Sequence, residues 1–102
     1  MYKLLITRSA EQDLDGIVDY IAVKLMNPSA ASALLDIIGE CYGSLKSTPR
    51  MFSECGDTYL KNKRYRKALI DNYLLIFRID ENSNTVYVLR FFYGAQDYIK
   101  QL

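Results

Sequence analysis

Three cations lie inside apolar, strand-like stretches of the chain, namely Lys67, Arg78 and Arg90. An unpartnered guanidinium is costly to bury, so we expect both arginines on a sheet face that the rest of the chain leaves uncovered. Cations on an apolar face could hold a phosphodiester, or could contact an apolar partner segment that carries acidic residues. A structural role is equally open, in which the arginines pair with nearby acids such as Asp80 or Asp97.

The chain contains no histidine and two cysteines, Cys41 and Cys55. Histidine is the usual general base and the commonest metal ligand. Two scattered cysteines make neither a zinc site nor a disulfide framework. We therefore expect no metal, no cofactor and no Cys–His dyad. Cys41 falls on an apolar helical stripe, which predicts a buried thiol rather than a reactive one.

The chain has 102 residues, half of them hydrophobic, which suits one domain over residues 1–102 with one core. The net charge is +1, so no strong overall field draws the protein to nucleic acid or membrane. We expect no direct DNA binding by the chain alone. No signal peptide or membrane-spanning segment is recognisable, which makes the cytoplasm the expected location.

The most β-rich stretch runs from Tyr65 to Tyr93 and holds three runs of branched and aromatic residues. The runs are separated by Asp71-Asn72 and by the polar cluster 80–84, which predict two hairpin turns. We expect strands at about residues 64–70, 73–79 and 85–93, with residues 2–6 as an added edge strand. Such a meander is marginal in water alone, so another layer must cover one face.

Two amphipathic helices precede these strands and can supply that layer. Ser9 and Gln12 match the S-x-x-Q capping box, which predicts that the first helix begins at Ser9. Asn27 can cap a second helix with Pro28 at its first position, and Thr48-Pro49 ends it. The short connection predicts an antiparallel helical hairpin. The expected fold is α+β, in the order β-α-α-β-β-β, with the hairpin on one face of the meander and a short C-terminal tail or helix.

The second and third runs are apolar on both sides, unlike a half-covered sheet. An odd residue count in the second hairpin loop would place the two arginines on one face. The uncovered face would then hold Leu74, Ile76, Arg78, Val86, Val88, Arg90 and Phe92, with Tyr65, Lys67 and Leu69. The helix-covered face would hold Ala68, Ile70, Tyr73, Leu75, Phe77, Ile79, Tyr87, Leu89, Phe91 and Tyr93. A one-residue register slip would invert a strand, and Arg66 falls on the covered side, which is comfortable only near the rim.

Several segments, taken in their order and spacing, resemble the RelE/ParE family of type II toxin–antitoxin toxins. They are YKLLITRSAEQDL, DYIAVKL, NPSAA, SLKSTPR and YRKALIDNYLLIFRIDENSNTVYVLRFFYG. The resemblance covers nearly the whole chain and implies the same β-α-α-β-β-β order. It also implies a neutralising antitoxin that wraps the toxin, which would account for the second apolar face. The implied antitoxin contacts are Leu74, Ile76, Val88 and Phe92.

One branch of this family comprises metal-independent, ribosome-dependent messenger RNA endonucleases. Lys67 matches this branch's pattern, and if the protein is such an endonuclease we expect the catalytic set to be Lys67, Arg78, Arg90 and Tyr93. The match is incomplete, because Leu74 stands where the pattern has a second-strand arginine and Gln96 where it has a C-terminal basic group. A phosphorane-like transition state needs dense positive charge, and most of that set is missing here.

The other branch, the ParE-like toxins, inhibits DNA gyrase without being a nuclease. The long helical hairpin and the GAQDY ending resemble this branch more closely, and the implied target contacts are Lys63, Arg64, Arg66 and Tyr98. The three cations belong to a basic run from Lys61 to Lys67, which could instead protect an exposed sheet edge from aggregation. Ala95 and Gln96 replace basic residues common in this branch, which leaves open a weakened toxin that serves as a non-enzymatic binding module.

Overall fold

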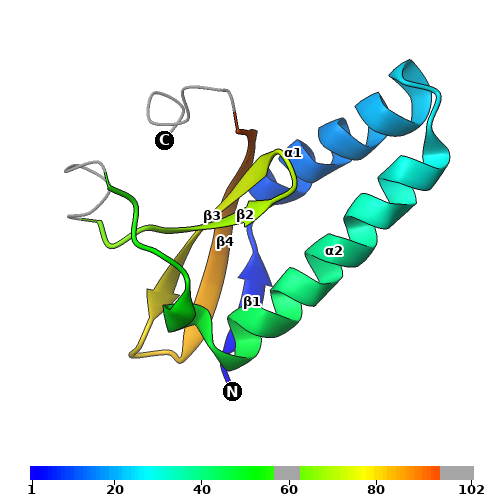
Figure 1. Cartoon of the computed structure of the whole chain (residues 1–102). Coiled ribbons are helices and arrows are strands. Elements are labelled where there is room, and N and C mark those ends of the chain that lie inside the picture. Colours follow the sequence, from blue (N-terminus) through cyan, green and yellow to red (C-terminus); the bar gives the residue numbers. More distant parts are fainter. Residues whose placement is uncertain (57–62, 95–102) are drawn as a thin grey trace.

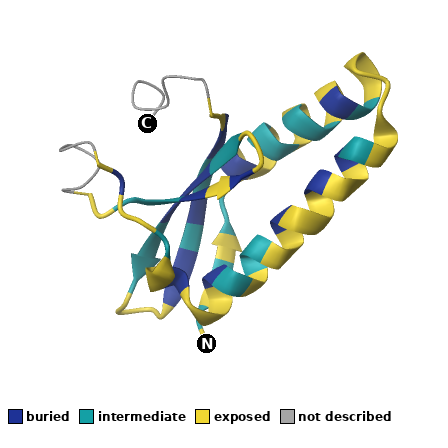
Figure 2. Cartoon of the chain, in the orientation of Figure 1, coloured by how far each residue is buried: buried dark blue, intermediate teal, exposed yellow. Residues whose placement is uncertain are grey.

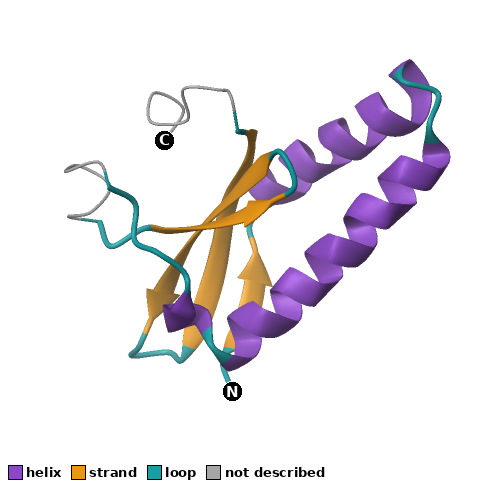
Figure 3. Cartoon of the chain, in the orientation of Figure 1, coloured by secondary structure: helices purple, strands orange, loops and turns teal. Residues whose placement is uncertain are grey.

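The computed structural model describes residues 1–56 and 63–94 (Figure 1). The elements are β1 (Lys3–Ile6), α1 (Arg8–Asp19), the π-helical turn η1 (Tyr20–Lys24), α2 (Pro28–Ser47), the 3-10 turn η2 (Pro49–Met51), β2 (Arg66–Ile70), β3 (Tyr73–Asp80) and β4 (Thr85–Tyr93). The predicted α+β order is confirmed, with a helical hairpin along one face of a four-stranded sheet (Figure 3). Within residues 1–56 and 63–94, no helix has the length and apolar character needed to cross a membrane.

The strand order in the sheet is β1-β4-β3-β2, so β4 is paired on both sides. The predicted edge strand is confirmed. It runs parallel to β4, from Lys3 opposite Thr85 to Ile6 opposite Val88. The other two pairings are antiparallel. Parallel neighbours need a crossover connection, and the helical hairpin belongs to that crossover.

The first helix begins earlier than the capping box predicted. Thr7, not Ser9, is the N-cap, because its Oγ1 accepts a hydrogen bond from the Ala10 backbone N at 3.2 Å. The same hydroxyl donates to the Leu89 carbonyl at 3.0 Å. Thr7 is thus fixed to the sheet as soon as β1 ends, and the chain turns directly into α1.

The second helix begins as predicted. The Asn27 side-chain oxygen accepts from the Ala30 backbone N at 3.1 Å, and Pro28 occupies the first helical position. Cys41, on the inner side of α2, is partly buried, and burial raises the pKa of its thiol to about 11. The thiolate is the reactive form, so Cys41 is a weak nucleophile near neutral pH.

The β2–β3 hairpin has the predicted two-residue turn, with Ile70 opposite Tyr73 and Asp71 in the left-handed region at φ 51°. The β3–β4 loop is different from the expectation, because Asp80 pairs with Thr85 and the loop therefore has four residues. Because the loop has an even number of residues, Val86 lies opposite Ile79. Val86 is therefore on the helix-covered face and not on the uncovered face, where it was predicted.

A β-bulge then reverses the alternation within β4. Phe77 pairs with Val88 while Ile76 pairs with Arg90, so Leu89 has no partner of its own on β3. Such an extra residue shifts the side chains that follow to the other face. Arg90 therefore still lies on the face away from the helices, as predicted.

The predicted faces are consequently wrong for four residues of β4. Val86 and Val88 are buried in the main core under the helices, where Tyr87 and Leu89 were expected. Tyr87 instead pairs with Arg78 on the opposite face, and Leu89 packs against a second cluster there. The cause is the even loop followed by the bulge.

The main core lies between the helical hairpin and the sheet (Figure 2). Its most deeply buried members include Ala10, Leu34, Ile38, Leu45, Leu75, Phe77, Val86 and Val88. In Figure 2 the buried colour follows β3 and β4, whereas the tip of the hairpin is largely exposed. The helices thus cover the sheet but extend beyond it (Figure 1).

A smaller cluster of Cys55, Ile76 and Phe92 occupies the face that was expected to be uncovered. The segment after η2 closes it, since the Cys55 N donates to the Tyr65 carbonyl at 2.9 Å and Lys67 N donates to the Ser53 carbonyl at 3.0 Å. The chain itself therefore covers part of this face.

Candidate functional site

Arg78 lies on the sheet face opposite the helices and stacks on an aromatic ring. Its guanidinium carbon is 4.3 Å from the centre of the Tyr87 ring. Asp80, the expected acidic partner, has its pKa held low chiefly by a hydrogen bond from Ser83 Oγ, with the charge of Arg78 a smaller cause. Lys67 pairs with Ile76, two residues before Arg78, so both cations are on this face.

Arg90 is held by an acid that the sequence did not reveal. Its Nε donates to Asp13 Oδ2 at 2.6 Å and its Nη2 to Asp13 Oδ1 at 3.1 Å, across the junction of β4 with α1. The hydrogen bond to Asp13 is the main cause of the raised pKa of Arg90. The guanidinium also lies 4.9 Å from the centre of the Phe92 ring. Its charge is largely balanced within the fold.

Tyr93 lies on the helix side of the sheet, away from Arg78. It pairs with Tyr73 across the β3–β4 ladder, and the two rings meet edge to face with their centres 5.7 Å apart. The proposed endonuclease set is therefore divided. Lys67, Arg78 and Arg90 share one face, but Arg90 is bound to Asp13 of α1, and Tyr93 lies on the other face.

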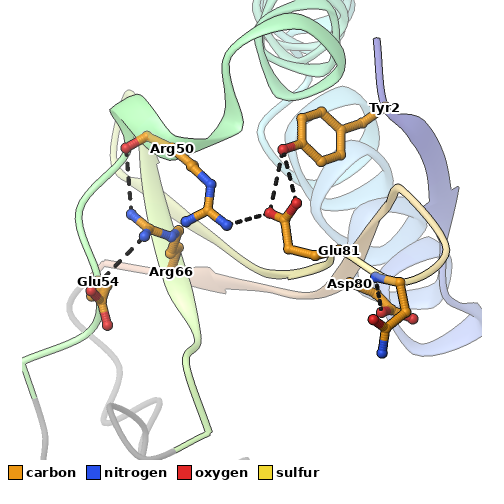
Figure 4. Close-up of polar contacts among 7 residues, drawn as sticks. Tyr2, Arg50, Glu54, Arg66, Asp80 and Glu81 are labelled. Atoms are coloured by element: carbon orange, nitrogen blue, oxygen red, sulfur yellow. Dashed lines mark hydrogen bonds and ion pairs between the residues drawn. The ribbon is translucent and has the colours of Figure 1, made fainter.

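Arg66 makes a polar contact with Glu54, in the segment that follows η2 (Figure 4). Its Nη1 donates to the Phe52 carbonyl at 2.6 Å, and its Nη2 lies 3.9 Å from Glu54 Oε1. Only 17% of its side chain is exposed. The predicted position on the covered side near the rim is thus explained, because the guanidinium bonds the segment that follows η2.

A second polar contact connects η2 itself to the β3–β4 loop. Arg50 forms an ion pair with Glu81, and the Tyr2 hydroxyl donates to Glu81 Oε1 at 3.3 Å (Figure 4). Lys63 and Arg64 are exposed in the turn just before β2, with the Lys63 ammonium 5.9 Å from the Tyr65 ring centre.

The expected target contact Tyr98 and the possible acidic partner Asp97 lie outside the described residues, as does Gln96. Among the residues that the structure describes, no three His, Cys, Asp or Glu side chains are grouped so that they could hold a metal ion.

The four apolar residues predicted to bind a partner are less accessible than expected. Ile76 and Phe92 are buried in the smaller cluster, and Val88 is buried in the main core. Leu74 is partly buried and pairs with Leu69, which is 73% exposed. Among the described residues of this face, Leu69 is the most exposed large apolar side chain, and Leu74 lies opposite it.

A groove of about 920 Å³ opens on the other side of the sheet, between the first helix and the ends of the last two strands. It is lined by Gln12, Asp13, Gly16, Ile17, Tyr20, Leu25, Asn72, Tyr73, Phe91 and Tyr93. No pattern in the sequence predicts this groove. Gly16 in mid-helix and the tyrosines at the strand ends were the available signals, but their meeting depends on the angle between helix and sheet.

A family model described as "ParE toxin of type II toxin-antitoxin system, parDE" matches residues 4–98. The chain belongs to the ParE toxin family. No curated protein sequence matches this ParE-family toxin significantly.

Two solved structures share its fold. One is the chromosomal ParDE TA system from P. aeruginosa, with a TM-score of 0.70 and 24% identity over 89% of this chain and 94% of that chain. The other is the toxin–antitoxin complex RelBE2 from Mycobacterium tuberculosis, with a TM-score of 0.61 and 22% identity over 90% and 96% of the two chains. The resemblance of the sequence to RelE/ParE toxins is thereby confirmed.

Proposed function

We propose that this ParE-family toxin arrests growth by inhibiting DNA gyrase through protein contact, and that a cognate antitoxin neutralises it in the cytoplasm. The observation that carries the proposal is the family match over residues 4–98 to ParE toxins. The fold shared with a ParDE system agrees with it.

The geometry of the cations supports a mechanism other than RNA cleavage. Several positive groups must converge on a scissile phosphate to stabilise its transition state. Arg90 is already bound to Asp13, and Tyr93 faces the helices. Of the four residues in the endonuclease set, three cations share one face, and one of these, Arg90, is held by Asp13.

For the gyrase contact we propose the exposed turn just before β2. Lys63 and Arg64 are accessible there, and Tyr98 is proposed as an additional contact. Arg66 contributes by fixing the neighbouring segment through the Phe52 carbonyl. For the antitoxin, the Leu69–Leu74 pair replaces the buried residues as the proposed contact on the far face.

Messenger RNA cleavage remains the second candidate because of one observation. Lys67 and Arg78 share a face with Tyr87, whose ring lies against the Arg78 guanidinium. Two cations beside a tyrosine could hold a phosphodiester. A weakened toxin that only binds a partner is the third candidate.

The test is induced expression without antitoxin, followed by two assays of the purified protein. Growth arrest with loss of gyrase supercoiling is expected for the wild type, and the double variant Lys63→Ala/Arg64→Ala should lose both. Arg78→Ala should retain both. Cleavage of ribosome-bound messenger RNA that disappears in Arg78→Ala, with supercoiling untouched, would instead establish the endonuclease. Normal growth would identify the binding module.

A further inference from the structure

Two tyrosine rings form a corner in the groove between α1 and the ends of β3 and β4. Tyr73 and Tyr93 meet edge to face, with their ring centres 5.7 Å apart and their planes at 73° to each other. Tyr20, the first residue of η1, lines the same groove. Three separate elements thus bring three aromatic rings to one recess.

The rings are accessible although they are large. Tyr20 is 54% exposed and Tyr93 is 48% exposed, whereas Phe91, another lining residue, is almost fully buried. A tyrosine has an apolar ring and a polar hydroxyl that can remain in water. Part of each accessible ring is therefore open to a ligand that enters the groove.

The tyrosine at the centre of this group is held in its neutral form. Burial raises the pKa of Tyr73, and the neighbouring Tyr93, Tyr20 and Asp71 raise it further. Each of these causes disfavours the phenolate, so the ring is uncharged at neutral pH. Because charges act in this way at short range, the shift also agrees with a position of Asp71 close to the three rings.

The acids around the groove favour a positively charged ligand. Asp71 is exposed in the β2–β3 turn, next to Asn72 of the groove lining, and Asp19 is exposed next to Tyr20 in the sequence. Lys24, at the end of η1, weakens this negative field without cancelling it, since two acids stand against one amine. An anionic ligand would be repelled here and a cationic one attracted.

Aromatic faces and nearby acids together suit an organic cation better than a metal ion. The face of a neutral ring attracts a cation, and several rings around one site form the cages that recognise methylated ammonium groups. Calcium and magnesium ions need several oxygen ligands, and the described part of the chain groups no three acidic, cysteine or histidine side chains in this way. The chemistry of the groove therefore matches an ammonium group carried by carbon.

The groove has room for more than the ammonium group. Its volume of about 920 Å³ lies near the upper end of the roughly 300–1,000 Å³ of small-molecule sites. Ile17 and Leu25 add apolar surface to the lining, and Gly16 leaves space, because no heavy atom lies within 4 Å of a Cβ built there. Gln12 and Asn72 offer side-chain amides for polar atoms of a ligand.

We propose that this groove binds a small organic ammonium ion, with its charged group among Tyr20, Tyr73 and Tyr93 and its carbon chain along Ile17 and Leu25. The site is separate from the gyrase contact proposed in the turn before β2, and neither depends on the other. Quaternary ammonium compounds and polyamines both have the required chemistry.

The test is a nuclear magnetic resonance titration of the full wild-type chain with choline, with spermidine and with the carbon analogue of choline. In that analogue a tert-butyl group replaces the trimethylammonium group, so shape is kept and charge is lost. At least one of the two ammonium ligands should shift the resonances of the groove tyrosines at millimolar concentration and bind about tenfold more tightly than the analogue. The better ligand identifies the class, quaternary ammonium or polyamine.

Substitutions at Tyr20 separate the aromatic face from apolar bulk. Tyr20→Leu should weaken binding of the better ligand by about fivefold or more, whereas Tyr20→Phe, which keeps the ring, should bind within about twofold of the wild type. Tyr20 is exposed at the surface, so both variants are expected to fold, and their melting temperatures check this.

Substitutions of single acids test the charge. Asp71→Asn should weaken binding, and asparagine suits the left-handed backbone of this position, where φ is 51°. Asp36→Asn, an exposed acid of α2, is the matched control and should have no effect. Equal binding of choline and its carbon analogue, equal affinities of Tyr20→Leu and Tyr20→Phe, equal effects of the two Asp→Asn variants, or no shift with either ammonium ligand would overturn the proposal.

Discussion

Asp13 on α1 binds Arg90 and the backbone of β4 with one carboxylate. Its Oδ2 accepts from Arg90 Nε at 2.6 Å and from the Phe91 N at 3.0 Å. The pairing of β1 with β4 ends at Ile6 opposite Val88, so the edge of β4 is open beyond that point. The Asp13 carboxylate accepts a hydrogen bond from a backbone N–H of this open edge, and it thereby holds the first helix at a fixed angle to the sheet.

Replacement of Asp13 by alanine should therefore destabilise the fold. The two side chains are 18% and 28% exposed, intermediate between surface pairs and buried ones. We expect a loss of about 2 kcal/mol in the free energy of unfolding, measured by denaturant titration. Asp15→Ala, an exposed acid of the same helix, is the control and should change the value little. Equal effects of the two substitutions would contradict the role given to Asp13.

The start of the first helix offers a second comparison. Thr7→Ala removes the hydroxyl that accepts from the Ala10 N and donates to the Leu89 carbonyl, which should cost about 1–2 kcal/mol. Ser9→Ala should cost much less, because Ser9 is an exposed residue of the first turn and not its cap. Thermal unfolding followed by circular dichroism distinguishes the two positions. A larger loss of stability for Ser9→Ala than for Thr7→Ala would instead support Ser9 as the N-cap.

Gly94, directly after β4, should tolerate no side chain. A Cβ there would lie 2.9 Å from the Asn72 backbone oxygen, which also accepts the Gly94 N hydrogen bond at 2.6 Å. Gly94→Ala is expected to cost about 1–3 kcal/mol, because backbone must move. Gly16→Ala should instead stabilise the protein by about 0.5–1 kcal/mol, since its helical site is open. Equal melting temperatures of both variants would refute this difference.

Alkaline pH should weaken the packing of α2. Burial raises the pKa of Cys41 from 9.0 to about 11 and that of Tyr42 from 10.0 to about 12. The folded state favours the neutral forms, so their contribution to stability is complete below pH 9 and is lost as the pH rises towards 12. We expect the urea midpoint to fall over this range. The fall should be smaller in the double variant Cys41→Ala/Tyr42→Phe, and parallel curves would exclude these groups as the cause.

The first β-hairpin could be predicted from the sequence and the second could not. A two-residue turn at Asp71-Asn72 fixes the register of its strands by itself. The cluster 80–84 allows several loop lengths, and the bulge at Leu89 is not local in origin. It lies where β1 stops pairing and Thr7 takes over, with bonds to the carbonyls of Val88 and Leu89. Contacts between positions so distant in the chain leave no periodic signal.

The same limit applies to the candidate sites. Arg78 lies on the predicted face, away from the helices, and Arg90 does so as well because the bulge offsets the even count of the loop. The strand patterns did not identify Asp13 as the partner of Arg90, nor the burial of Ile76 under the segment after η2. Both depend on how separate elements meet, and so does the groove. The functional roles of Lys63, Arg64 and Lys67 stay predictions.

The pairing of β1 with β4 determines when the toxin can complete its fold during synthesis. Lys3 lies opposite Thr85, so the opening strand has no place in a sheet until β4 has left the ribosome. The helical hairpin can form while translation continues, but the face it covers is not yet made. Each nascent toxin therefore remains incomplete through most of its translation, and a partner already present in the cell could meet it at the moment it folds.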